Sequence, residues 1–204
     1  MTKPLEHWDQ VYSTKNETDV SWYQAHPDRS LALIKAAVPS VSASVLDIGG
    51  GASRLVDELL VLGYSDLTVL DVSQAALGHS KARLGTLADK VSWIVADITQ
   101  WTPSRTWDIW HDRAVFHFLS APKDQDSYVA ALEAATRPGS IAVISTFALN
   151  GPERCSGLPV QRYSPATLAA RIGSRFELVT EALEAHTTPS GSVQNFAYAV
   201  LKRW

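Results

Sequence analysis

The sequence predicts a single α/β domain built on a doubly wound sheet of seven strands, with helices on both faces. Two observations carry this prediction. Short apolar runs alternate with helical patterns along most of the chain, which is typical of a mostly parallel sheet. Two β-rich segments with no helix between them close the chain, and they predict a C-terminal antiparallel hairpin. With 204 residues, 46% of them hydrophobic, residues 1–204 can bury one core and are expected to form one domain.

The helices are expected where a capping or breaking residue borders an apolar helical pattern. Pro27 opens the second helix, Gly63 ends the third, and Ser73 is a good N-cap for the fourth. Pro138-Gly139 is expected to end the fifth helix, and Ser164-Pro165 to cap and start the sixth. The six predicted helices cover residues 5–12, 27–38, 53–62, 73–88, about 123–136, and 164–173.

The strands are expected at short apolar runs bordered by turn residues. Five such runs are predicted to form the parallel part of the sheet, and they cover residues 44–48, 67–72, 91–98, 107–111 and 141–147. Residues 176–183 and 196–201 form the predicted hairpin, because Pro189 and Gly191 lie in their connection.

The glycine-rich stretch from Asp47 to Ser53 is the most informative motif of the chain. It reads Asp-x-Gly-x-Gly-x-Ser and leads from an apolar strand into a helix. Glycine lets the backbone approach a ligand closely and adopt positive φ. A carboxylate two residues before the first glycine repels a phosphate but suits cationic groups, such as an amino-acid ammonium and a sulfonium. The motif therefore favours S-adenosylmethionine over NAD, although a plain tight turn explains it equally well.

Two further acids end the next two apolar runs. Asp71 lies 20 residues after Gly51, where such sheets place a carboxylate that accepts both ribose hydroxyls. Asp97 ends the third run and suits an adenine amino group. Each acid alone is more simply a helix N-cap or a solvated strand end. Three acids at the carboxyl ends of consecutive strands instead indicate one ligand crevice.

Composition narrows the possible partners and location. The formal net charge is −3 and no run of Lys or Arg occurs, which disfavours a nucleic-acid partner. Cys155 is the only cysteine, so a reducing cytoplasm is expected. The N-terminus lacks the apolar core of a signal peptide, and no apolar stretch approaches the ~20 residues of a membrane helix. No membrane partner and no metal site are predicted.

The order of these motifs resembles the class I S-adenosylmethionine-dependent methyltransferases over nearly the whole chain, which implies a Rossmann-like fold. The resemblance implies a methionine-binding turn at Asp47, Gly49, Gly50 and Gly51, a ribose site at Asp71 and Val72, and an adenine site at Asp97 and Ile98. It also implies that residues 107–113, Asp112 included, face the cofactor and its methyl group. Ser53 departs from the family pattern, because many members carry a third glycine there.

The N-terminal aromatic residues resemble those of two subgroups, the small lysine methyltransferases and the thiopurine or thiol methyltransferases. In both, such residues fold over the cofactor. Residues 1–26 are therefore expected to form a cofactor lid through Trp8, Tyr12 and Trp22, with Tyr23 facing the substrate. A hydrophobic staple for the first helix is an equally good interpretation.

Methyl transfer mainly requires the nucleophile and the methyl group to be aligned at ~3 Å, so no catalytic triad is expected. A base is needed only for a protonated nucleophile. His117 is the predicted base and Asp112 the second catalytic candidate. A structural histidine packed between Phe116 and Phe118 is the competing interpretation of His117.

The substrate wall is expected to come from segments at the same sheet edge. Residues 148–163 form a long loop of the kind that often serves as a lid. Cys155 is the only thiol in it, and a buried, inert cysteine is the competing interpretation. His186 is expected at the hairpin turn, where a solvated histidine is the alternative. The full set of predicted substrate residues is Tyr23, Arg113, Phe116, Cys155, Arg162 and His186.

Three functions fit these patterns. The first is methyl transfer from S-adenosylmethionine, with S-adenosylhomocysteine as product, to a small molecule at nitrogen or sulfur. The second is protein lysine methylation, suggested by the N-terminal aromatic residues and Asp112. The third is a cofactor-binding module without catalytic activity.

Overall fold

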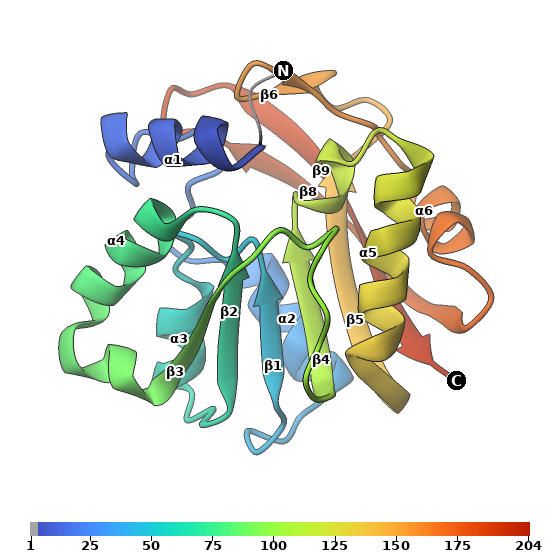
Figure 1. The fold of residues 1–204 in the computed structure, drawn as a ribbon. Coiled ribbons are helices and arrows are strands. Elements are labelled where there is room, and N and C mark those ends of the chain that lie inside the picture. Colours follow the sequence, from blue (N-terminus) through green and yellow to red (C-terminus); the bar gives the residue numbers. More distant parts are fainter. Residues whose placement is uncertain (1–3) are drawn as a thin grey trace.

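Seven strands of the computed structural model, which describes residues 4–204, form one sheet (Figure 1). They are β1 (Val45–Ile48), β2 (Leu67–Asp71), β3 (Val91–Val95), β4 (Trp107–Arg113), β5 (Thr136–Phe147), β8 (Phe176–Thr187) and β9 (Val193–Arg203). Their order across the sheet is β3-β2-β1-β4-β5-β9-β8. The first five strands are parallel, and β9 runs antiparallel to both β5 and β8. The predicted fold class is confirmed.

The helices begin and end close to the predicted positions. They are α1 (Pro4–Thr14), α2 (Asp28–Ala37), α3 (Leu55–Val61), α4 (Gln74–Leu84), α5 (Pro122–Ala134) and α6 (Pro165–Ile172), with the short 3-10 helices η1 (Gly85–Lys90) and η2 (Phe116–Phe118). Ser73 caps α4 by accepting the backbone N–H of Ala76 at 3.1 Å. Ser164 and Thr167 form a capping box at the start of α6. No helix within residues 4–204 is long and apolar enough to cross a bilayer.

The sheet is buried on both faces by two separate apolar cores. Because side chains alternate along a strand, Val45 and Leu46 of β1 belong to opposite cores. The core beneath Val45 includes residues of α2, α3 and α4, and the core beneath Leu46 includes residues of α5 and α6. Such double burial explains the near-continuous apolar runs of the central strands.

The strand order places a crevice at the carboxyl ends of β1 and β4. The chain after β1 crosses to β2 on one side, and β4 pairs with β1 on the other, so the order reverses between β1 and β4. Ligands of doubly wound sheets bind at this point. Helix α1 and the small hairpin of β6 (Arg154–Cys155) and β7 (Leu158–Pro159) lie beyond this edge, at the top of Figure 1.

Three local predictions were wrong. Helix α5 ends at Ala134, before Pro138-Gly139, and these two residues lie inside β5, where Gly139 has φ +93° next to an irregularity in the pairing with β4. The terminal hairpin is longer than predicted, so His186 lies in β8 opposite Gln194 and not in the turn. Residues 148–163 contain the β6–β7 hairpin and are therefore more regular than expected.

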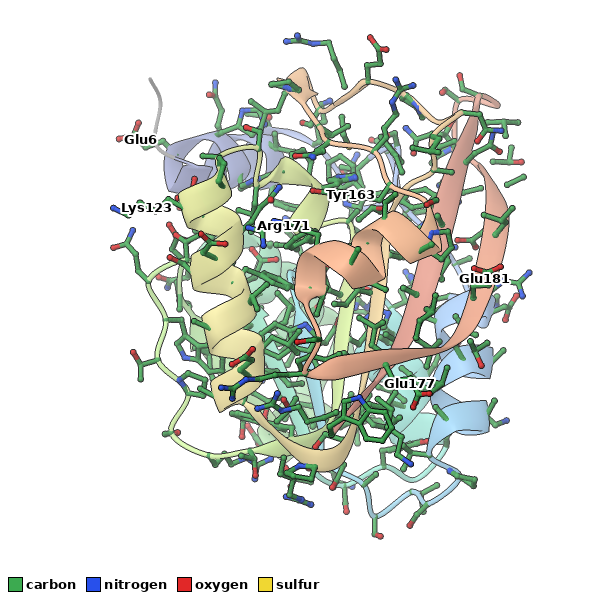
Figure 2. The ribbon with its side chains drawn as sticks, turned by 90° about the vertical axis from the view of Figure 1, so that its right-hand side faces the viewer. Glu6, Lys123, Tyr163, Arg171, Glu177 and Glu181 are labelled. Carbon is green, nitrogen blue, oxygen red and sulfur yellow. The ribbon has the colours of Figure 1, made fainter. Side chains whose placement is uncertain are left out.

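An arginine links α5 to α6 above their shared apolar core, and the outer edge strand of the sheet carries exposed acidic residues. Figure 2 shows Arg171 of α6 between the two helices, where its Nη2 donates to Asp126 of α5 at 2.6 Å. Strand β8 is the last of the sheet, and Glu177 and Glu181 are exposed on it (Figure 2). Charged side chains on an edge strand oppose further strand pairing.

Replacing Tyr128 by Phe tests a buried polar network that joins α5 to β4. The Tyr128 hydroxyl donates to Asp112 Oδ2 at 2.6 Å and accepts the Trp110 indole N–H at 2.9 Å. Because Asp112 and Trp110 stay buried when the hydroxyl is removed, we expect the free energy of unfolding to fall by ~1–3 kcal/mol. At this chain length that lowers the melting temperature by about 2–4 °C per kcal/mol. Calorimetry measures the change.

Tyr64→Phe is the matched control, because the Tyr64 ring is also buried but its hydroxyl makes no hydrogen bond within the described residues. Equal melting temperatures for the two variants would contradict the role of the Tyr128 hydroxyl.

Candidate functional site

A cavity of about 500 Å³ lies at the carboxyl ends of the parallel strands, and we call it the main cavity. This volume is in the range of small-molecule sites. The strand ends and the turns after them contribute Ile48, Gly49, Leu70, Asp71, Val72, Ala96, Asp97, Ile98, Arg113 and Ala114. The opposite wall is mainly aromatic and apolar, and includes His7, Trp8, Tyr12, Trp22, Phe118, Cys155, Leu158 and Phe196.

A second cavity of about 50 Å³, the small cavity, lies beside the glycine turn. Asp47, Gly49, Gly50, Tyr23, Arg54 and His111 are among the residues that line it. Tyr12, Trp22, Ile48, Gly49 and Arg113 line both cavities. The Trp22 indole N–H donates to the Tyr12 hydroxyl at 3.1 Å, so this aromatic pair lies where the two cavities meet. The cavities are thus two parts of one groove.

The glycine turn has no room for side chains. A Cβ on Gly49, where φ is +65°, would lie 2.1 Å from Val115 Cγ2. A Cβ on Gly50 would lie 2.5 Å from Asp47 Oδ2, and one on Gly51 would lie 2.7 Å from Asp71 Oδ2. The backbone of the turn is therefore wedged between the two carboxylates, which is the close approach that the glycine motif predicts.

Asp71 is a buried acid at the end of β2, with 7% of its surface exposed. Its Oδ1 accepts the Ser73 backbone N–H at 2.8 Å. Burial raises the pKa of Asp71 to about 7, and the nearby Asp47 carboxylate adds to this rise. A ligand that donates hydrogen bonds to Asp71 would favour its ionised form.

Asp97 stabilises the turn after β3. Its Oδ1 accepts the backbone N–H and the hydroxyl of Thr99 at 2.9 and 2.7 Å. Asp97 lines the main cavity together with Val72 and Ile98. The three acids at the strand ends thus lie along the same groove: Asp71 and Asp97 in the main cavity, and Asp47 in the small one.

Two oppositely charged groups in the small cavity each have an unpartnered atom. Asp47 accepts from His111 through Oδ1, but its Oδ2 is buried without a hydrogen-bond partner among the described residues. Arg113 donates through Nε to the Tyr198 hydroxyl and through Nη1 to the Trp22 carbonyl, whereas its buried Nη2 has no hydrogen-bond partner there. The Glu184 carboxylate lies 3.8 Å from this Nη2. A buried polar atom without a hydrogen-bond partner is unfavourable, so the small cavity suits a group that carries both an ammonium and a carboxylate.

His117 is not placed to act as a base. The side chain is fully buried, does not line either cavity, and packs against Phe118 and Phe147. Its Nδ1 accepts the Phe147 backbone N–H at 3.3 Å, and burial lowers its pKa to about 3. The structure therefore supports the competing interpretation, a packed structural histidine.

Asp112 and Phe116 are also structural. Both are completely buried and outside the two cavities. The Asp112 carboxylate accepts the backbone N–H groups of Val115 and Phe116 and the Tyr128 hydroxyl, at 2.8, 3.1 and 2.6 Å. Burial raises its pKa to about 6. Since both oxygens are engaged inside the protein, the predicted catalytic and cofactor roles of Asp112 are corrected to one of shaping the turn after β4.

Two predicted substrate residues lie away from the groove. His186 is buried, and its Nε2 donates to the Ser21 carbonyl at 2.8 Å, so it is neither a base nor a solvated turn residue. Arg162 donates to the Gly151 carbonyl at 3.1 Å and to Glu153 at 2.9 Å, and so braces its own loop. The other three, Tyr23, Arg113 and Cys155, line the groove. Burial raises the pKa of the Cys155 thiol to about 12, so it stays protonated.

The N-terminal lid, residues 4–26, is tied to the domain by hydrogen bonds. The Ser73 hydroxyl donates to Asp9 at 2.5 Å, and His79 donates to the Tyr12 carbonyl at 2.8 Å. Trp8 packs edge-on against Trp22 and Phe118. Trp8, Tyr12 and Trp22 line the main cavity, and residues 1–3 of the predicted lid lie outside the described residues.

Sequence reasoning missed several polar residues of the groove, and three of them carry a histidine or acid that could act on a ligand. His7 lines the main cavity, and its buried Nε2 has no hydrogen-bond partner among the described residues. Asp124, in the first turn of α5, lines the same cavity, and His111 lines the small one. His7 precedes Trp8 and His111 precedes Asp112 in stretches that the sequence had singled out, so their positions were a usable signal.

Comparison with known proteins identifies the family. A family model described as a methyltransferase domain matches residues 45–139. EEF1A lysine methyltransferase 2 of Danio rerio is 30% identical over 156 residues, which cover 69% of this chain and 67% of that protein. The eEF1A lysine and N-terminal methyltransferase of Mus musculus is 28% identical over 95 residues, 47% of this chain but only 13% of the longer mouse protein.

A solved structure shows the same fold. The 1,6-didemethyltoxoflavin-N1-methyltransferase of Burkholderia thailandensis, with bound 1,6-didemethyltoxoflavin and S-adenosylhomocysteine, has a TM-score of 0.75 at 21% identity, covering 98% of this chain and 88% of that one. The sheet order, the family model and the relatives agree. The chain belongs to the class I S-adenosylmethionine-dependent methyltransferases.

Proposed function

We propose that this protein transfers the methyl group of S-adenosylmethionine to a nitrogen or sulfur atom of a small molecule. The main cavity carries this proposal, because its volume of about 500 Å³ lies beneath the aromatic residues of the N-terminal lid. Such a covered site holds a small acceptor and keeps water away from it. The cytoplasm is the location we propose, from the lone cysteine Cys155.

The residues of the groove fit the cofactor. The unpartnered Asp47 Oδ2 would accept from the ammonium of the methionine tail, and the unpartnered Arg113 Nη2 would donate to its carboxylate. Asp71 would accept the ribose hydroxyls, and Asp97 with Ile98 would hold the adenine. When bound, the cofactor supplies an electrophilic methyl group.

The remaining residues of the main cavity would serve the acceptor. Trp8, Trp22 and Phe118 provide apolar walls that exclude water. His7 is the residue that we propose as base in place of His117, because its unpartnered Nε2 can accept a proton from the nucleophile. Asp124 adds an acid that would attract an amine.

Protein lysine methylation is the second candidate. The relative from Danio rerio is named as a lysine methyltransferase. Asp124 would pair with a lysine ammonium entering the main cavity as readily as with a small amine. The lid favours the small molecule, because Trp8, Tyr12 and Trp22 line the main cavity and a hydrogen bond joins the last two.

Incubation of the protein with methyl-labelled cofactor and cell lysate separates these functions. We expect the label in the small-molecule fraction. Label in protein, mapped to lysine by mass spectrometry, would support the second candidate. Cofactor binding without any transfer of label would contradict both, and would favour a binding module.

Asp71→Ala is expected to weaken binding of S-adenosylhomocysteine about tenfold to a few hundredfold, because charge-assisted hydrogen bonds worth ~1.5–3 kcal/mol are lost. Titration calorimetry measures this. Asp66→Ala, which removes an exposed carboxylate paired with Arg105 just before β2, is the control and should bind normally. Unchanged affinity in a folded Asp71→Ala protein would refute the ribose assignment.

The raised pKa of Asp71, about 7, predicts a pH dependence of both binding and stability. Cofactor affinity should rise from pH 6 to pH 8 as Asp71 ionises. In the free protein the folded-state pKa exceeds the unfolded value of 3.8, so ionisation opposes folding as the pH rises from about 4 through 7. Asp71→Asn should therefore raise the melting temperature at pH 8 while flattening the pH dependence of affinity. A lower melting temperature at pH 8 would show that Asp71 stabilises the free protein.

His7→Gln is expected to lower turnover about 10²-fold with unchanged cofactor affinity, since a general base typically contributes 10²–10⁴-fold. Turnover is followed from pH 6 to pH 9 as label entering the acceptor fraction. His26→Gln is the control, because the His26 side chain is 70% exposed. Equal turnover for both variants at every pH would exclude His7 as a base.

A further inference from the structure

Three buried polar residues form a continuous chain behind the glycine turn. Asp47 of β1 and His111 of β4 are register partners in neighbouring strands, and His111 Nδ1 lies 2.7 Å from Asp47 Oδ1. His111 Nε2 lies 2.8 Å from the Ser30 hydroxyl of α2. Asp47, His111 and Ser30 are only 4, 3 and 1% exposed. The chain therefore links the floor of the groove to the helix behind the sheet.

The chemistry of this chain fixes the direction of its hydrogen bonds at the carboxylate. An ionised carboxylate only accepts, so His111 Nδ1 carries the proton and donates to Asp47 Oδ1. This leaves Oδ2 as the free oxygen. Gly50 keeps the space beside this buried oxygen free of a side chain, because a Cβ at that position would lie 2.5 Å from Oδ2. Asp47, Gly50 and His111 all line the small cavity.

An Asp–His–Ser chain also occurs in hydrolases, where the serine is the nucleophile. That role does not fit here. Ser30 is 1% exposed and lines neither the main nor the small cavity. A substrate in the groove cannot reach the Ser30 hydroxyl. The hydrogen bonds that join Ser30, His111 and Asp47 therefore act on the groove through Asp47.

We propose that His111, supported by Ser30, is a positioning residue that holds the Asp47 carboxylate with Oδ2 facing the ammonium of the methionine tail. The terminal torsion of an aspartate is broad, so the carboxylate needs a fixed partner to keep one orientation. His111 supplies that partner from the neighbouring strand. This inference rests on the proposed cofactor site and adds to it a residue that makes its contribution through Asp47.

Three ligands separate this role from a merely structural one. S-Adenosylhomocysteine carries the ammonium and the carboxylate, its decarboxylated analogue keeps only the ammonium, and 5′-methylthioadenosine has neither. In His111→Leu we expect at least a tenfold loss of affinity for the first two and a change of less than twofold for the third. Titration calorimetry on the full chain measures all three, with melting temperature recorded for each variant.

Two further variants keep the test decisive. His111→Asn retains a donor for Asp47 and should recover most of the lost affinity for S-adenosylhomocysteine. Ser30→Ala removes only the far end of the chain and should show a smaller loss with the same ligand pattern, so it serves as the test if His111→Leu does not fold. Equal losses for all three ligands, or no loss for any, would overturn the positioning role. If the unaltered protein binds none of them, the proposed cofactor site itself fails.

Discussion

The close approach of the glycine turn to two buried carboxylates is the constraint on which the rest of this site depends. Asp47 and Asp71 end neighbouring parallel strands, and the missing side chains of Gly50 and Gly51 leave space beside Asp47 Oδ2 and Asp71 Oδ2. Parallel strands ending at one sheet edge bring such acids together automatically. Burial of two neighbouring carboxylates is unfavourable for the fold, and it raises the pKa of Asp71. A ligand that donates hydrogen bonds to both carboxylates would offset this unfavourable burial, so ligand binding would also stabilise the fold.

The sheet and the lid contribute different kinds of side chain to the groove. The sheet edge supplies fixed polar groups, because Asp71, Asp97 and Arg113 come directly from strand ends or the turns after them. The lid supplies aromatic surface through Trp8, Tyr12 and Trp22, and is held by individual hydrogen bonds to α4 and β8. Arg54 and Arg83 also donate to Glu17 of the lid, and Arg113 donates to the Trp22 carbonyl, so the lid is fixed to the domain at several points.

Arg113 connects these two parts. Its guanidinium lies over the Phe196 ring at 4.3 Å, contacts the lid through the Trp22 carbonyl, and reaches both cavities. The same charge lowers the pKa of His186, after the larger effect of burial. One buried cation thus influences the lid, the groove and the terminal hairpin. A substitution of Arg113 would disturb several contacts at once. Its role is therefore better tested by comparing ligands with and without a carboxylate than by mutation.

The sequence by itself determined the fold and the edge of the sheet at which the groove lies. Apolar runs, caps such as Ser73 and the glycine turn are local patterns, and they are decided by neighbours along the chain. Which histidine faces the groove was decided only by tertiary structure. His117 and His7 both lie beside aromatic residues in sequence, but packing against Phe147 from β5 buries the first, and the lid places the second in the main cavity. Asp112 likewise gained its partner Tyr128 from a separate helix. Burial and hydrogen bonding of a side chain depend on elements distant in sequence, which periodicity and motif spacing do not specify.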